Sequence, residues 1–128
     1  MNNKQVEEEH KKINEMMEKE LGIKSEFKVM AVGYLSISEP YDMGEVPIGF
    51  TEKLEYVYNN GLILASLGHH DCEFCINKGV KPATSSSEKS ISDEKNKIEY
   101  RFPQMIFHYI EEHQFKPQQK FIDFIMEQ

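Results

Sequence analysis

The residues of this sequence that could do chemistry together are two cysteines and two histidines. Cys72 and Cys75 form a C-x-x-C pair and are the two cysteines of the chain, and His108 and His113 form a later H-x4-H pair. Thiolate sulfur and imidazole nitrogen are the usual ligands of a closed, four-coordinate zinc site. The chain between the two pairs is much longer than in a zinc finger, so such a site would tie a central loop to C-terminal helices. The spacings therefore predict one structural zinc ion, held by both cysteines and one or two histidines.

The sequence leaves open which histidines would bind. His70 is a rival ligand, because one residue separates it from Cys72. His108 and His113 differ by about 500° of rotation on a regular helix at ~100° per residue, so both could bind one ion only if His113 lay beyond the helix end. Residues 114–117 (QFKP) predict an ending there. The alternative is that the two cysteines are buried or half-buried free thiols and that His108 is a core histidine bonded to backbone.

Two catalytic alternatives use the same residues. A redox-active C-x-x-C pair usually sits within a βαβ unit, and the acidic neighbours Asp71 and Glu73 would raise the pKa of a thiol. Cys72 could instead be a nucleophile with His69 or His70 as its base, although neighbours in sequence need not reach one another in space. The chain has no glycine-rich phosphate loop, no G-x-S-x-G and no H-E-x-x-H. We therefore expect a protein that is not an enzyme, with reduced, non-catalytic thiols if no metal binds.

The composition describes an acidic protein of one-domain size. The chain has 128 residues, of which 39% are hydrophobic and 29% charged, and its formal net charge is −7. That length fits a single domain whose core needs no disulfides. An acidic chain is a poor general nucleic-acid binder, and with a mean hydropathy of −0.60 no window approaches the ~20 apolar residues of a membrane span. The N-terminus lacks the apolar stretch of a signal peptide, so we expect a cytoplasmic protein.

The elements that would position these residues are predicted from periodicity and turn residues. Apolar residues at helical spacing predict an N-terminal helix within residues 1–24, ending near Gly22, and two later helices that begin at Pro103 and Pro117. The other predictions are a buried strand over 27–37 with a possible bulge at Gly33, a helix over 50–60, a short strand over 62–67, a flexible loop over 76–90 and a β-hairpin around 93–96. Helices at both ends with strands between them predict one α+β domain over residues 1–128, with a small antiparallel sheet.

Three segments resemble a family of small, mostly uncharacterised bacterial proteins. They are a G-Y-L…G-x-V-P…F-x-x-K-L segment that begins at Gly33, an H-x-C-x-x-C segment at 70–75, and a closing H-Y-x-x-x-H segment followed by Pro117. The resemblance covers roughly residues 29–125, and its closing segment is the most specific. A second proline often follows where this chain has Gln118, which affects only the start of the last helix. The resemblance implies a compact domain without an established activity, and small acidic bacterial proteins of this type often belong with toxin–immunity systems.

The acidic charge and the lack of a complete catalytic constellation predict a protein that acts by occupying another protein's surface. The favoured hypothesis is a cytoplasmic binding protein that neutralises or regulates a protein partner, most simply a bacterial toxin immunity protein with a basic toxin domain as its partner. Complementary charge speeds association and sets specificity. The candidate contacts are acidic residues expected at exposed helix or hairpin positions: Glu111, Glu112, Asp93, Glu94 and Glu99. The alternatives are a structural-zinc adaptor or regulatory domain and, second, a Cys/His enzyme.

Overall fold

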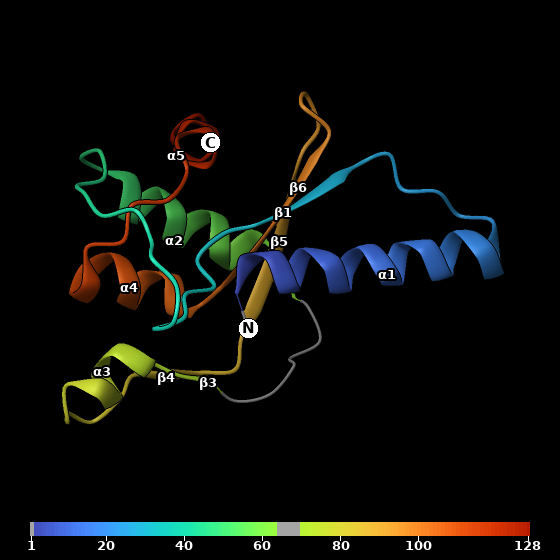
Figure 1. The fold of residues 1–128 in the computed structure, drawn as a ribbon. Helices are drawn as coiled ribbons and strands as arrows, with labels where there is room; N and C mark the ends of the chain where they lie inside the picture. Colours follow the sequence, from blue (N-terminus) through green and yellow to red (C-terminus); the bar gives the residue numbers. More distant parts are fainter. Residues whose placement is uncertain (1, 64–69) are drawn as a thin grey trace.

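A small twisted sheet organises the chain in the computed structural model, which describes residues 2–63 and 70–128 (Figure 1). Within these residues, four strands form one sheet in the order β1-β6-β5-β2, and β3 and β4 form a separate pair. The strands are β1 (Lys28–Ala31), β2 (Leu62–Ile63), β3 (His70–Asp71), β4 (Thr84–Ser85), β5 (Glu88–Asp93) and β6 (Ile98–Pro103). The predicted hairpin is present as the antiparallel pair of β5 and β6.

The α+β class is confirmed, but the sheet is mixed and not purely antiparallel. β1 runs parallel to β6, with Lys28 opposite Ile98 and Ala31 opposite Arg101. Parallel neighbours need a long crossover connection, whereas antiparallel neighbours can be joined by a tight turn. The chain from β1 to β6 is such a connection, and it contains most of the other elements, including the C-x-x-C segment.

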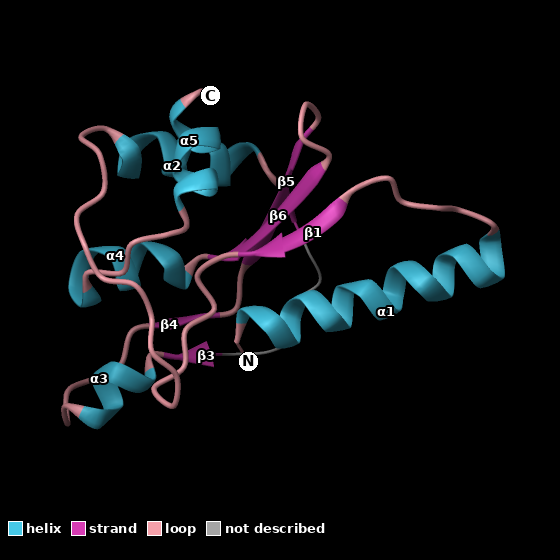
Figure 2. Cartoon of the chain, turned by 45° about the horizontal axis from the view of Figure 1, so that its top comes forward, coloured by secondary structure: helices cyan, strands magenta, loops and turns pink. Residues whose placement is uncertain are grey.

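Helices lie at both ends of the described chain and beside the sheet (Figure 2). They are α1 (Asn3–Leu21), α2 (Phe50–Asn60), α3 (Glu73–Asn77), α4 (Met105–His113) and α5 (Gln119–Met126). α1 begins at a capping box, in which the side chains of Asn2 and Gln5 each accept a hydrogen bond from the other residue's backbone N–H. It ends at Gly22, which takes a left-handed conformation with φ +66°, as predicted.

The core lies between the sheet and the helices α2, α4 and α5. Phe121 of α5 is fully buried, and its ring contacts Phe50, Tyr100 and Phe102 at centroid distances of 6.4, 5.2 and 5.5 Å. Edge-to-face and tilted contacts of this kind add stability beyond the apolar area that they bury. The concentration of aromatic residues near the C-terminus is therefore used for packing, and these rings hold α5 against β6 and α2.

α1 lies along β1, apart from the other helices (Figures 1 and 2). Val6 is its one fully buried side chain in the described structure, whereas its second half leaves apolar side chains exposed, namely Ile13, Met16, Met17 and Leu21. No helix in the described part of the chain has both the length and the apolar character needed to span a bilayer.

Three predicted segments differ from the structure. The strand expected over 27–37 is limited to β1, because Gly33 takes a left-handed conformation with φ +87° and its backbone lies against Ile106. The strand expected over 62–67 is present as β2, and residues 64–67 lie outside the described residues. The stretch 76–90, expected to be a loop, contains β4 and the beginning of β5, since β4 pairs with the strand that precedes Cys72.

Candidate metal centre

Four side chains from two distant parts of the chain converge at one buried point. The Sγ atoms of Cys72 and Cys75 and a ring nitrogen of His108 and of His113 all lie within 4.8 Å of one another. His113 Nε2 is 3.3 Å from Cys72 Sγ, 3.7 Å from Cys75 Sγ and 3.2 Å from His108 Nε2. Cys75 Sγ is also 3.3 Å from His108 Nε2. This cluster of two thiols and two imidazoles could hold a metal ion.

The two cysteines are positioned by a tight turn around α3. Cys72 is the residue before the helix, and its backbone N–H donates to the carbonyl of Ala83 at 2.9 Å, which ties it to the end of the β3–β4 pair. After the helix, the N–H groups of Lys78 and Val80 both donate to the carbonyl of Cys75 at 3.1 Å. Both cysteines are free thiols and are buried, Cys72 completely and Cys75 with 7% exposure.

The two histidines come from α4, and His113 is the last residue of that helix instead of a residue beyond it. Gln114 follows in a left-handed conformation with φ +53°, and Phe115 N–H donates to the carbonyl of Tyr109 at 3.1 Å. The hydroxyl of Tyr41 donates to the carbonyl of His113 at 2.9 Å. The imidazole rings meet through their outer edges, with centroids 4.9 Å apart and planes at 73°.

Aromatic rings pack around His113 and the turn that carries the two cysteines. Phe74 of α3 lies 5.1 Å from the His113 ring and also contacts Tyr109 and Tyr41, at 6.0 and 5.3 Å between centroids. Phe115 also contacts Tyr41, with ring centroids 6.2 Å apart. The turn with the two cysteines is therefore attached to α4 through apolar contacts as well as through the Cys/His cluster.

The same burial changes the acid–base properties of the cluster. It raises the pKa of the Cys72 thiol, although the backbone N–H groups of Cys75 and Phe74 donate to the sulfur and act in the opposite direction. Burial, together with the nearby His108 and Lys78, lowers the pKa of His113. Both groups are thus held in their neutral forms in the metal-free protein, and a bound cation would be needed to favour the thiolates.

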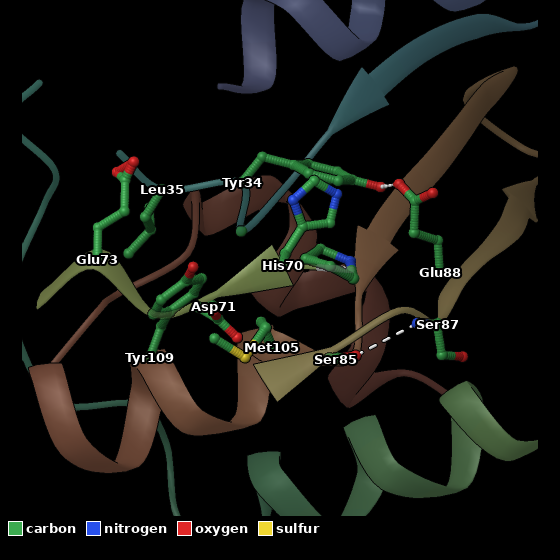
Figure 3. Close-up of a pocket in the computed structure, with 12 residues that line it drawn as sticks. Tyr34, Leu35, His70, Asp71, Glu73, Ser85, Ser87, Glu88, Met105 and Tyr109 are labelled. Carbon is green, nitrogen blue, oxygen red and sulfur yellow. Dashed lines mark hydrogen bonds between the residues drawn. The ribbon is translucent and has the colours of Figure 1, made fainter. Parts of the chain in front are cut away.

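His70 is not part of this cluster, and His69 lies outside the described residues. His70 is on β3, is exposed, and lines a pocket beside the cluster together with Tyr34, Glu88 and Tyr109 (Figure 3). The histidine that contacts Cys72 Sγ is His113. The structure therefore does not pair Cys72 with His70 as nucleophile and base.

The acidic residues expected to be exposed divide into two groups. Glu111 and Glu112 on α4 and Glu94 at the hairpin tip are exposed, as predicted. Asp93 is buried, with 5% exposure, and its carboxylate accepts hydrogen bonds from the side chain and the backbone N–H of Asn96 within the turn. Glu99 is half-buried and lies 3.7 Å from Nε2 of His10 on α1. The prediction of exposed contacts is therefore wrong for Asp93 and Glu99.

Sequence reasoning missed a buried polar network between β5, β6 and the chain after β1. Glu88 of β5 and Arg101 of β6 are buried and joined by contacts of 3.2 and 3.3 Å, and the Tyr34 hydroxyl donates to Glu88 at 2.6 Å. The hairpin register places Glu88 and Arg101 as diagonal neighbours on one face. No sequence signal identified this pair, because Glu88 fell within the loop expected over 76–90 and outside the predicted hairpin.

Comparison with known proteins gives a family without an assigned activity. The chain belongs to the family of a domain of unknown function (DUF7919), whose model matches residues 8–126. The match confirms the resemblance to an uncharacterised family. The matched range begins within α1, whereas the resemblance began near residue 29. No curated protein and no solved structure matches the chain at a significant level. All four residues of the Cys/His cluster lie within the matched range.

Proposed function

We propose that this member of the family is a small binding protein whose fold is closed by a structural zinc ion. The zinc ion in this proposal is supported by the spacing of the four ligand atoms. In a tetrahedral site with Zn–S of about 2.3 Å and Zn–N of about 2.0–2.1 Å, neighbouring ligand atoms lie roughly 3.3–3.8 Å apart. Four separations among Cys72, Cys75, His108 and His113 run from 3.2 to 3.7 Å, and all the ligand atoms lie within 4.8 Å of one another.

The donor set supports zinc in a structural role. Two thiolates and two imidazoles suit zinc better than magnesium or calcium, which prefer oxygen ligands. Four protein ligands fill a tetrahedral shell, so no position is left for water or substrate. An ion held in this way would join the α3 turn, which lies within the crossover connection, to α4, which follows β6. Its binding free energy would add directly to the free energy of folding.

The zinc proposal predicts that Cys72→Ser loses both metal and stability. Protein purified without chelator should contain about one zinc per chain by elemental analysis. The Cys72→Ser variant should contain none and should unfold at a temperature lower by at least about 10 °C, because structural zinc contributes several kcal/mol to folding. Thermal unfolding followed by circular dichroism, with and without chelator, measures the second effect.

His70→Ala is the matched control, because His70 is close in sequence to Cys72 but lies outside the cluster. It should retain zinc and a nearly unchanged unfolding temperature. A wild-type protein that contains no metal, and whose unfolding temperature does not respond to chelator, would remove the zinc proposal. Loss of zinc in His70→Ala would instead restore His70 as a ligand.

We infer the kind of partner from the acidic charge of this protein. The net charge of −7 and the exposed side chains of Glu111, Glu112 and Glu94 favour a basic protein surface. The specific form of this proposal is an immunity protein that neutralises a basic toxin domain, such as a nuclease that itself binds a polyanion. Acidic side chains on the inhibitor would then occupy the place of phosphates.

Co-expression with the product of the adjacent gene tests the partner proposal. The two proteins should co-purify, and their association rate should fall as salt rises. Reversing charge with Glu111→Lys and Glu112→Lys should lower that rate several-fold, whereas the equal change Glu18→Lys and Glu20→Lys on α1 should have a smaller effect. A neighbour that is harmless when expressed alone, or binding that ignores the α4 reversals, would favour the zinc-stapled adaptor instead.

A further inference from the structure

The four residues of the Cys/His cluster are not equally covered by the rest of the fold. Cys72 is fully buried, and Cys75 and His113 are each 7% exposed. His108 is half-buried and is the most accessible of the four. One edge of the cluster therefore approaches solvent, and His108 forms that edge.

A hollow on the surface of the protein begins at His108. It encloses about 650 Å³ of empty space, including its open mouth. Its walls come from α4 and from the chain around β4, and they include Ala83, Gln104 and Phe107. His108 lines this hollow, whereas the other three members of the cluster do not. The space next to the cluster is thus open on the side of one ligand.

His113 and Cys72 are held by segments outside their own elements. Phe74 of α3 lies 5.1 Å from the His113 ring, and the hydroxyl of Tyr41 donates to the His113 carbonyl at 2.9 Å. The backbone N–H of Cys72 donates to the carbonyl of Ala83 at 2.9 Å. Because protein interiors are closely packed, moving either ligand away from an ion would require these segments to separate.

The ring of His108 has less support. In the part of the chain that the structure describes, the aromatic rings that contact it are Tyr109 and His113 of its own helix, at 6.0 and 4.9 Å between centroids. Outside α4, its Nε2 atom lies 3.3 Å from Cys75 Sγ. Rotation about its Cα–Cβ bond would carry the ring into the empty space beside it. Side-chain rotation is far faster than the separation of packed segments.

We propose that His108 is the exchangeable ligand of the metal centre, and that the hollow beside it is the route by which metal and small nitrogen or sulfur donors enter and leave. This inference rests on the proposed zinc site. When the bond from His108 Nε2 to the ion breaks, both cysteines and His113 keep theirs, and the donor atom of the incoming molecule forms the fourth bond. Zinc sites with three protein ligands and one open position bind water or substrate in the same way.

Chemical rescue with free imidazole tests the proposal. His108→Ala should retain about one zinc per chain and release it to a coloured chelator at least tenfold faster than the wild type. Imidazole should slow this release, because it enters the hollow and replaces the missing ring without a change of charge. His113→Ala is the matched control, since it removes the same donor from a covered position. It should lose most of its metal, and imidazole should not restore it.

The wild-type protein gives a second measurement that does not depend on the folding of either variant. Its rate of zinc release should rise with chelator concentration, because the chelator reaches the ion through the hollow. Release that required unfolding of the cluster would proceed at a rate independent of the chelator. Cobalt(II) in place of zinc reports the coordination directly: its absorption bands should change in His108→Ala and return when imidazole is added.

The possible failures are distinguishable. Equal metal loss in His108→Ala and His113→Ala without rescue by imidazole would overturn the inference and leave the metal centre in place. A wild-type release rate that ignores the chelator concentration would do the same. If the wild type showed no thiolate-to-cobalt absorption, the metal centre itself would be rejected, and this inference with it.

Discussion

At the scale of single residues, two adjacent acidic side chains in the hairpin turn have opposite roles. Asp93 is buried and accepts hydrogen bonds from Asn96 at 3.2 Å to its backbone nitrogen and 2.8 Å to its side chain. Glu94 is exposed and lies 3.9 Å from Lys97. An exposed ion pair such as Glu94–Lys97 contributes little to stability, whereas hydrogen bonds to a buried carboxylate contribute more.

Asp93→Asn should therefore change how the free energy of unfolding depends on pH. Burial by itself would raise the pKa of Asp93, but hydrogen bonds from Asn96 and Lys95 outweigh it and hold this pKa below its usual value of 3.8. The unfolded chain then binds a proton more readily than the folded one, so the stabilisation is complete above about pH 5 and is lost as pH falls through the folded pKa. We expect Asp93→Asn to lower the free energy of unfolding at pH 7 by about 1 kcal/mol.

Urea unfolding at several pH values measures this effect, with Glu94→Gln as the control for loss of charge in the same turn. The difference between wild type and Asp93→Asn should shrink below about pH 4. A difference of the same size at pH 3 and pH 7 would mean that the ionised carboxylate is not the stabilising form.

The cysteine pair and the histidine pair of the candidate metal centre could be predicted from the sequence, whereas the burial of Asp93 and Glu88 could not. C-x-x-C and H-x4-H are short local patterns, and cysteine and histidine pairs at these spacings are typical of zinc ligands. Whether a carboxylate is buried depends on partners across the hairpin, such as Arg101 for Glu88, and on the turn that encloses Asp93. Charge patterns alone favour exposure for all of these residues.

At the scale of elements, Gly33 decides where β1 ends and how closely α4 approaches. Its φ of +87° lies in the left-handed region, and a Cβ atom there would lie 2.9 Å from Cγ1 of Ile106. Ile106 is fully buried on α4, the helix that also carries both histidines of the cluster. The close contact at Gly33 therefore contributes to the position of the metal centre.

Gly33→Ala should be strongly destabilising. The left-handed conformation costs an alanine about 1–2 kcal/mol, and the clash with Ile106 adds about 1–3 kcal/mol of overpacking. Gly79→Ala is a matched control, because Gly79 also has a left-handed φ of +74° but nothing within 4 Å of its Cβ position. Chemical unfolding should show a loss in Gly33→Ala at least about 1 kcal/mol larger than in Gly79→Ala; equal losses would contradict the close contact.

Sequence patterns predicted the helices more completely than the strands. α1 has an apolar spacing, a capping box and a terminal glycine, all of them local signals. β1 was predicted too long because its apolar residues continue to Ile37, while the pairing that ends the strand involves β6, far along the chain. The parallel partner of a strand leaves no local signal, which is why the mixed sheet was not predicted.

At the scale of the whole molecule, α1 is attached to the rest of the fold mainly through its first half. Val6 is fully buried, Glu7 accepts the backbone N–H of Ala31 at 3.0 Å, and Leu21 is 66% exposed. The second half of the helix therefore extends from the body of the protein with few contacts, as Figure 1 shows.

Truncation at the two ends of α1 should have unequal effects. Val6→Ala should lower the free energy of unfolding by about 1–3 kcal/mol, because it removes buried apolar atoms. Leu21→Ala should change it by less than about 0.5 kcal/mol. Hydrogen exchange should also be faster for the amides of residues 13–21 than for those of residues 6–12. Equal losses of stability in the two variants would show that the second half of α1 is covered in solution.

The parallel pairing of β1 with β6 also sets the order in which the chain can fold during synthesis. β1 leaves the ribosome long before its partner, since Lys28 must wait for Ile98 and Ala31 for Arg101. Translation proceeds at ~5–20 residues per second, so β1 remains unpaired for roughly several seconds, and pairings of high contact order form slowly. The nascent chain therefore presents an open strand edge until β5 and β6 emerge, and that interval is when a chaperone would be most useful to it.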